Sequence, residues 1–314
     1  MDTDFDSDIL ILDGGLATEL EKRGYDISGP LWSAQLLLDA PDAIEQLHYD
    51  YFASGAQCVT SASYQASYGG FASLGFTPEE TTLVLQRSVA LARSARDRFE
   101  KDQARDSNAS IKADGKKRYV AASVGPYGAT LHDGSEYHGN YGLSVSDLKA
   151  FHAPRFSVLA DSGADVLACE TIPSLDEARA LLDLLGYHGH TQAWLSFTSP
   201  DGVHTSHGEP LADCARAADS VKSVFAVGVN CVHPRVVTTA IRELARGTEK
   251  PIVVYPNSGE QWDAGSRQWR GAPHGSRLAD LAPAWVDAGA RFIGGCCRTG
   301  PADTAALARA MSST

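Results

Sequence analysis

The sequence has no apolar run near the ~18 to 20 residues that a membrane-spanning helix requires, so no membrane partner is expected. It also lacks an excess of positive charge: 27 Lys and Arg against 39 Asp and Glu give a formal net charge of −12. So negative a chain is a poor ligand for phosphate backbones, and we expect no nucleic-acid partner. The N-terminal segment MDTDFDSD has no basic residue, unlike a secretory or transit peptide, which predicts a cytoplasmic protein.

Cysteine is scarce, with six among 314 residues, too few for a disulfide scaffold. We expect Cys58, Cys169 and Cys214 to be small buried hydrophobic residues. Nucleotide-binding motifs are missing as well. The pair Gly14 and Gly15 lacks the GxGxxG spacing and no GxxxxGK occurs, so a nucleotide cofactor has no support.

What the sequence does contain is a regular alternation of short apolar runs with amphipathic segments. Such alternation is typical of a parallel sheet covered by helices. Eight runs are predicted as strands: 9–12, 58–61, 119–124, 166–169, 193–197, 225–229, 252–255 and 292–295. The polar stretch 101–118 is predicted to be a solvated loop. Eight strands, each followed by a helical segment, favour an α/β fold, a (β/α)8 TIM barrel, as a single domain over residues 1–314. An open doubly wound sheet remains the alternative.

Polar residues gather where these strands end, which is where a barrel places its chemistry. The ends read Asp13-Gly14-Gly15, Ser63-Tyr64-Gln65, Gly125-Pro126-Tyr127, Glu170-Thr171, Thr198-Ser199, Asn230-Cys231, Asn257-Ser258-Gly259 and Cys296-Cys297-Arg298. A shared pocket at the carboxyl rim is therefore predicted.

Three of these strand-end residues are cysteines: Cys231 after the sixth strand, and Cys296 and Cys297 after the eighth. Three thiolates can hold one zinc ion and leave its fourth position open for a substrate, as a catalytic site requires. A redox-active pair formed by Cys296 and Cys297 is the competing interpretation. His204 and His207 are expected to be solvent-exposed loop residues, and the Gly- and Tyr-rich loop 128–143 to form a lid.

Seven motifs together resemble the zinc-dependent homocysteine S-methyltransferases. They are LDGGLATEL (12–20), ASYQAS (62–67), SVGPYGA (123–129), ACETIPS (168–174), GVNC (228–231), VVYPNSGE (253–260) and GGCCRTGP (294–301). LWSA (31–34), TSASYQAS (60–67) and YPNSGE (255–260) look most like the branch that uses S-methylmethionine or S-adenosylmethionine as methyl donor. The resemblance implies a (β/α)8 barrel that methylates homocysteine to methionine, with one Zn²⁺ per chain bound by Cys231, Cys296 and Cys297.

The substrates would be small molecules, and the strand-end residues provide anchors for them. Asp13 and Glu170 suit the homocysteine ammonium, as at the matching positions of the family, although helix capping or a salt bridge would also explain them. The backbone N–H groups of Gly14, Gly15 and Leu16 are expected to bind its carboxylate. Trp32 is expected either to face the sulfonium donor through a cation–π contact or to be a packing residue.

Tyr64, Gln65 and Asn230 are predicted pocket residues without assigned roles. Three other functions stay open. A selenocysteine methyltransferase would use the same site, a thiol-based sensor would use the cysteines alone, and a zinc hydrolase is disfavoured because three thiolates weaken the Lewis acidity of the metal. The oligomeric state is not predicted.

Overall fold

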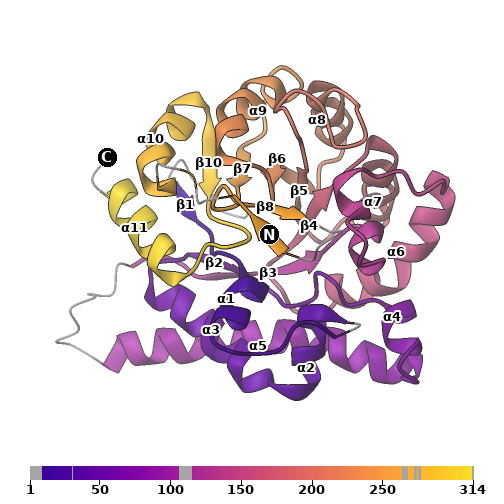
Figure 1. Ribbon diagram of the computed structural model, residues 1–314, viewed down its shortest axis with the longest axis vertical. Helices are drawn as coiled ribbons and strands as arrows, with labels where there is room; N and C mark the ends of the chain where they lie inside the picture. The colour runs from indigo at the N-terminus through magenta and orange to yellow at the C-terminus, as the bar shows by residue number, and fades with distance from the viewer. Residues whose placement is uncertain are drawn as a thin grey trace.

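In the computed structural model the chain forms a barrel of parallel strands inside a ring of helices (Figure 1). The structure describes residues 9–29, 31–105, 115–263, 268–271, 274 and 277–312. Within these ranges eight strands form one sheet: β1 (Leu10–Ile11), β2 (Cys58–Thr60), β3 (Tyr119–Val124), β4 (Val166–Ile172), β5 (Ala193–Phe197), β6 (Val224–Asn230), β7 (Ile252–Tyr255) and β10 (Ala290–Ile293). All eight predicted strands are confirmed.

The sheet closes on itself. Its hydrogen-bonded order is β1-β10-β7-β6-β5-β4-β3-β2, and the two end strands then meet, because Leu12 forms a parallel bridge with Cys58. The N–H of Asp13 donates to the Cys58 carbonyl at 3.0 Å, one residue beyond that bridge. The predicted (β/α)8 barrel is therefore confirmed, and the open sheet is wrong.

One long helix follows each strand and packs on the outside of the barrel (Figure 1). These helices are α3 (Pro41–Ala53), α5 (Pro78–Arg105), α6 (Val145–Ala160), α7 (Leu175–Tyr187), α8 (Leu211–Asp219), α9 (Val237–Leu244), α10 (Leu278–Ala288) and α11 (Pro301–Ser312). Shorter helices lie in the connections: α1 (Leu16–Lys22), η1 (Trp32–Gln35), α2 (Leu36–Asp39), α4 (Tyr68–Ala72), η2 (Tyr127–Thr130), η3 (Ser135–Tyr137) and η4 (Pro234–Val236). No helix in the described ranges is both long and apolar enough to cross a membrane.

Apolar side chains fill two layers. The outer layer lies between strands and helices, and the inner layer, which includes Trp194 and Phe292, fills the barrel. Small inward side chains at Ala121 and Ala168 leave room for the large Trp194 ring. Cys58 belongs to the inner layer, and Cys169 and Cys214 to the outer one, so their predicted burial is confirmed.

Three helix-to-strand turns depend on glycine. Gly55, Gly163 and Gly289 have φ of 102°, 80° and 120°, a left-handed conformation that side chains disfavour. Each of these glycines lies within three residues of the first residue of the following strand. The repeated Ser/Ala-Gly-Ala tripeptide is thus the signal that reverses the chain into the barrel.

Some predictions about extent were wrong. Helix α5 continues to Arg105, so the predicted polar loop starts later than residue 101, and residues 106–114 of that stretch lie outside the described residues. Strand β4 runs on to Ile172, through Glu170. The short antiparallel pair β8 (Gln261–Asp263) and β9 (Gln268–Arg270), inserted after β7, was not predicted.

Candidate active site

A cavity of about 430 Å³ lies at the carboxyl ends of the barrel strands. The strand-end residues predicted from the sequence converge on it although they are far apart in the chain. The lining includes all of the predicted site residues: Asp13, Gly14, Gly15, Trp32, Tyr64, Gln65, Glu170, Asn230, Cys231, Cys296 and Cys297. The geometry therefore groups them into a single site.

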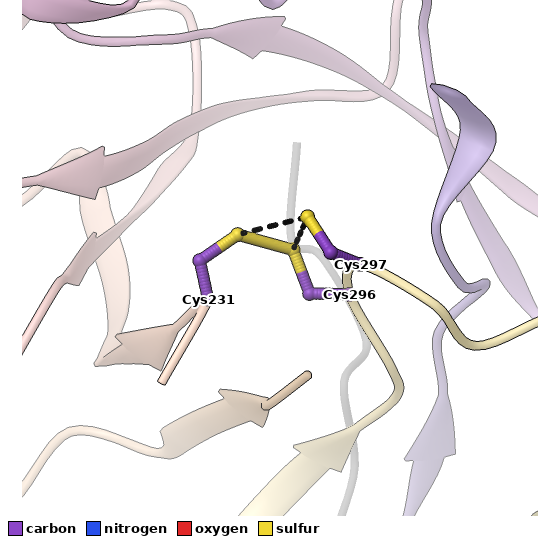
Figure 2. A group of neighbouring side chains, drawn as sticks. All are labelled: Cys231, Cys296 and Cys297. Carbon is purple, nitrogen blue, oxygen red and sulfur yellow. Dashed lines mark hydrogen bonds between the residues drawn. A yellow bond between two sulfur atoms is a disulfide. The ribbon is translucent and has the colours of Figure 1, made fainter. Parts of the chain in front are cut away.

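The three cysteines point toward one another from two strand ends (Figure 2). The Sγ atom of Cys297 lies 3.9 Å from that of Cys231 and 4.0 Å from that of Cys296. Cys231 and Cys296 are joined as a disulfide, and Cys297 is a free thiol. The predicted redox pair of Cys296 with Cys297 is therefore not the pair that is bonded.

This donor set fits a metal ion. Tetrahedral thiolate ligands at the usual Zn–S distance of about 2.3 Å lie about 3.8 Å from one another. Both separations to Cys297 match that spacing, and the three sulfurs all lie within 4.8 Å of one another. Burial raises the pKa of the Cys297 thiol to about 12 without an ion, and the negative charge of Glu136 adds to the shift. The reduced triad can hold a metal, and the disulfide is its oxidised alternative.

Backbone strain is concentrated around the cavity. Among the described residues, five that are not glycine have positive φ: Trp32, His132, Thr171, Cys231 and Arg298. Trp32, Thr171 and Cys231 line the cavity, and Arg298 directly follows Cys297. Such conformations are disfavoured and persist where the surrounding contacts fix them, often at functional sites.

At Thr171 the fixing contacts are visible. Residues 170 and 171 of β4 face the single Ser196 of β5, because Cys169 pairs with Leu195 and Ile172 with Phe197. Asn230 Oδ1 accepts hydrogen bonds from the Thr171 N–H at 2.7 Å and the Ser196 hydroxyl at 2.8 Å. The bulge brings both Glu170 and Thr171 to the cavity, whereas Cys169 and Ile172 pack in the outer core.

Two buried carboxyl groups lie in the same cavity. Burial, and to a smaller extent the negative charge of Glu170, raises the pKa of Asp13 to about 8, although the Thr60 backbone N–H and hydroxyl donate hydrogen bonds to its carboxylate. Burial likewise raises the pKa of Glu170 to about 7, although the Ser123 hydroxyl donates to its Oε1. A bound cation would stabilise the ionised form of both groups.

The family model for homocysteine S-methyltransferase matches residues 10–311. The homocysteine S-methyltransferase YbgG of Bacillus subtilis is 46% identical over 309 residues, which cover 98% of this chain and 96% of YbgG. The chain belongs to the homocysteine S-methyltransferase family. A selenocysteine Se-methyltransferase of Brassica oleracea is 42% identical, over 96% of this chain and 90% of its own.

Among solved structures of the family, the metallated homocysteine methyltransferase MmuM of Escherichia coli aligns with a TM-score of 0.85 and 43% identity, covering 97% of this chain and 96% of MmuM. An oxidized form of MmuM aligns with the same TM-score at 44% identity, covering 96% of each chain. These comparisons confirm the family, the fold and the enzyme class expected from the sequence.

One predicted role within the family site is wrong. The N–H of Gly15 donates to the Thr299 carbonyl at 2.9 Å, so it is not free to bind a substrate carboxylate. Gly15 instead allows a close approach. A Cβ atom there would lie 2.6 Å from the carbonyl oxygen of Cys296 and 2.6 Å from Thr18 Oγ1. The absent side chain lets α1 pack directly against the segment that carries Cys296.

The predicted donor side of the cavity is aromatic. The Trp32 ring stacks on His132 with centroids 6.0 Å apart and an interplanar angle of 9°. Gln65 accepts a hydrogen bond from the Ser33 hydroxyl at 3.1 Å, which ties the η1 turn to the loop after β2. Burial raises the pKa of the Tyr64 phenol far above its usual range. Trp32 therefore both packs and faces the cavity.

Several site residues were missed in the sequence. Glu136 and Tyr137, on η3, line the cavity, as does Tyr255 at the end of β7. The hydroxyl of Tyr255 accepts from Trp194 Nε1 at 2.9 Å and lies 2.7 Å from the Ser196 hydroxyl. Tyr255 belongs to the motif VVYPNSGE (253–260), and Glu136 and Tyr137 belong to the loop predicted to be a lid. All three could therefore have been proposed as pocket residues.

The loop histidines behave as expected. His204 and His207 are exposed, and each pairs with a carboxylate of its own loop: Asp201 at 2.9 Å and Glu209 at 2.7 Å. Neither belongs to the three-residue group that can share a metal ion in the described part of the chain.

Proposed function

We propose that this protein transfers a methyl group from a sulfonium donor, S-methylmethionine or S-adenosylmethionine, to the thiol of L-homocysteine, giving methionine. The observation that carries the proposal is the convergence of three cysteine sulfurs and two buried carboxyl groups on one cavity. A cytoplasmic location suits an enzyme that depends on reduced thiols, and it remains a prediction.

Cys231, Cys296 and Cys297 are proposed to hold one Zn²⁺ per chain. When bound, the ion supplies positive charge that stabilises the homocysteine sulfur as a thiolate at neutral pH, where a free thiol is mostly protonated. Three thiolate ligands also favour sulfur chemistry over hydrolysis, because anionic ligands reduce the acidity that activates water. The two sulfur separations to Cys297, which match tetrahedral ligation, support this assignment.

Asp13 and Glu170 are proposed to bind the homocysteine ammonium. Their burial makes each carboxylate unfavourable on its own, and a cation between them removes that cost. The N–H groups of Gly14 and Leu16 remain candidates for the carboxylate of the substrate. Held at these points, the acceptor presents its sulfur in a fixed direction, which lowers the entropic part of the barrier.

Trp32 is proposed to face the donor. An aromatic ring attracts a sulfonium ion by roughly 0.5 to 2 kcal/mol through the cation–π interaction. Tyr64 and Gln65 line the adjoining wall of the cavity. In the transfer, the homocysteine sulfur forms a bond to the methyl carbon while the bond from that carbon to the donor sulfur breaks. The electron pair of the broken bond stays on the donor sulfur, which leaves as a neutral thioether.

The test is a donor panel with homocysteine in which S-methylmethionine, S-adenosylmethionine and betaine are compared for methionine formation. We expect turnover with at least one sulfonium donor and little with betaine. Absence of methionine with both sulfonium donors, in reduced protein supplied with zinc, would contradict the proposal.

Selenocysteine is a second candidate acceptor, favoured by the 42% identity to the Brassica oleracea enzyme. A selenol is more acidic than a thiol and would use the same cavity. Parallel assays with homocysteine and selenocysteine, at equal donor concentration, compare kcat/KM for the two. A higher kcat/KM with selenocysteine would make selenocysteine, and not homocysteine, the principal acceptor.

A further inference from the structure

Glu136 differs from the other acidic residues of the cavity that the proposed function leaves without a role: Glu21 and Asp26 are exposed to solvent, whereas Glu136 has a buried carboxylate oxygen. It lies on η3, in the loop after β3, and lines the cavity. Its Oε2 atom is fully buried and accepts no hydrogen bond from the described residues. Asp13 and Glu170, by contrast, each accept hydrogen bonds, from Thr60 and Ser123. A buried carboxylate oxygen without a donor is costly, so the site is built for one that arrives with a ligand.

The turn that carries Glu136 is held in place. The Asp133 carboxylate accepts from the Ser135 N–H at 2.9 Å, and the Glu136 carbonyl accepts from the Thr198 hydroxyl at 3.4 Å. The backbone nitrogen of Glu136 packs so closely on Gly128 that a Cβ atom there would lie 2.5 Å from it. The backbone that carries Glu136 is therefore fixed in the wall of the cavity.

Glu136 shares its cavity with both parts of the proposed reaction centre. Tyr64, Glu136 and the three cysteines all line the same cavity of about 430 Å³. This cavity is where a donor would lie once its methyl group is directed at a sulfur held beside the cysteines.

Only one cationic group of the methyl donor can provide the hydrogen bond that Oε2 of Glu136 lacks. A sulfonium carries positive charge but has no N–H, so it cannot donate a conventional hydrogen bond to Oε2. An α-ammonium group provides charge and three N–H donors together. The ammonium of homocysteine is already assigned to Asp13 and Glu170, which leaves the ammonium of the donor.

We propose that Glu136 binds the α-ammonium group of the methyl donor and so makes the site selective for donors that are amino acids. This inference rests on the proposed methyl transfer and deepens it. A donor whose cation has no N–H, such as betaine or a simple alkylsulfonium carboxylate, leaves Oε2 unpaired and binds more weakly for that reason.

The experiment compares two ligands that differ only at the ammonium: S-methylmethionine and its desamino analogue 4-(dimethylsulfonio)butanoate. Donor affinity is measured as KM for S-methylmethionine, and as the inhibition constant of the analogue against it, in zinc-loaded wild type and Glu136→Gln. Wild type is expected to prefer S-methylmethionine. In Glu136→Gln the KM of S-methylmethionine should rise about 10- to 100-fold, while the inhibition constant of the analogue stays within about twofold.

Asp133→Asn is the matched control, since it removes a negative charge from the same loop, keeps the acceptor for Ser135 and lies outside the cavity lining. It should leave the donor KM unchanged. Glu136→Asp, which retains the charge on a shorter side chain, should fall between wild type and Glu136→Gln.

Three results would overturn the inference: equal affinity of wild type for both ligands, an equal loss for both in Glu136→Gln, or a rise in the homocysteine KM in place of the donor KM. Each presupposes an active wild-type enzyme. An inactive wild type would instead contradict the methyl transfer itself, so the two failures are separate.

Discussion

Asn230 and Thr171 exchange two hydrogen bonds between the ends of β6 and β4, across the intervening strand β5. The Thr171 N–H donates to Asn230 Oδ1, and Asn230 Nδ2 donates to Thr171 Oγ1, both at 2.7 Å. These bonds hold a β-branched residue at φ of 63°, in the bulge that follows Glu170. Since Cys231 follows Asn230, one side chain links a proposed substrate anchor to a proposed metal ligand.

Replacing Asn230 by Ala should therefore disturb homocysteine binding. The Thr171 N–H would lose its partner in a buried site, at a cost of about 1 to 3 kcal/mol in the free energy of unfolding. The bulge would relax, Glu170 would shift, and the KM for homocysteine should rise about tenfold or more. Thr171→Gly, which accepts positive φ without strain, should restore part of the affinity in the double variant. An unchanged homocysteine KM in Asn230→Ala would show that the bulge does not position Glu170.

Asp13→Asn and Glu170→Gln should each raise the homocysteine KM about 10- to 100-fold and leave the zinc content unchanged. Each removes one charged partner of the ammonium, and neither touches the cysteines. Asp50→Asn, in a surface pair with Arg23, is the control and should behave as wild type. Wild-type kinetics in both cavity variants would refute the anchoring role.

The same carboxyl groups predict a pH dependence. Because burial raises the pKa of Asp13 to about 8 and of Glu170 to about 7, both are largely protonated at pH 6 in the free enzyme. Ionisation as pH rises from 6 to 8 strengthens ammonium binding, so the homocysteine KM should fall over that range. In Glu170→Gln the fall should be smaller. A homocysteine KM that rises over this range would contradict the assignment.

Gly15→Ala should weaken zinc binding by about 10- to 100-fold, as is usual when a residue that holds a metal ligand in position is changed. The added Cβ collides with the Cys296 carbonyl, and the backbone that carries Cys296 must move. Gly186→Ala is the control, because nothing lies within 4 Å of its Cβ position and Gly186 lies inside α7. Zinc titration followed by competition with a chelator measures the zinc affinity of both variants. Equal affinities in Gly15→Ala and wild type would show that this contact does not position the triad.

His48 predicts acid sensitivity of the fold. It is completely buried in α3, and neither ring nitrogen has a hydrogen-bond partner among the described residues. Burial lowers its pKa from 6.5 to about 4. Above pH 6.5 the ring is neutral in both states. Between pH 6.5 and 4 only the unfolded chain takes up a proton, so the free energy of unfolding falls by about 3 kcal/mol on the way down.

His48→Leu should remove the part of that slope that His48 contributes and keep full stability at pH 7, since it deletes unsatisfied polar atoms from an apolar site. Denaturant unfolding at pH 7, 6 and 5 measures it. His190→Gln, on an exposed imidazole, serves as the control. His152 is also buried with a lowered pKa, so a smaller slope should persist in His48→Leu. An identical slope in wild type and His48→Leu would contradict the assignment to His48.

The barrel could be predicted from sequence because its strands are short continuous apolar runs that fall between glycine turns. The strand predicted at residues 193–197 and β5 have the same bounds. The bulge in β4 could not be predicted, because Thr171 is a good strand residue and its conformation depends on Asn230, 59 positions away in sequence. The local sequence pattern contains no information about a hydrogen-bond partner so far away in the chain.

The site residues, like the fold, could be predicted from the sequence only in part. Cysteines and carboxylates at strand ends were visible because their chemistry is rare at those places. Glu136 was not, since an acidic residue in a polar loop is usually solvated, and only the fold shows that Oε2 is buried. The role of the Gly15 N–H was wrong for a related reason: its partner Thr299 follows the last strand, and only barrel closure brings it near.

The proposed methyl transfer depends on Cys231, Cys296 and Cys297 together holding one zinc ion that the reaction needs. The most direct measurement is metal analysis by mass spectrometry on reduced protein, paired with methionine formation, for wild type, Cys297→Ser and the control Cys214→Ala in the outer core. We expect about one zinc per chain and full activity in wild type and the control, and loss of both in Cys297→Ser. A metal-free protein that still methylates homocysteine would contradict it.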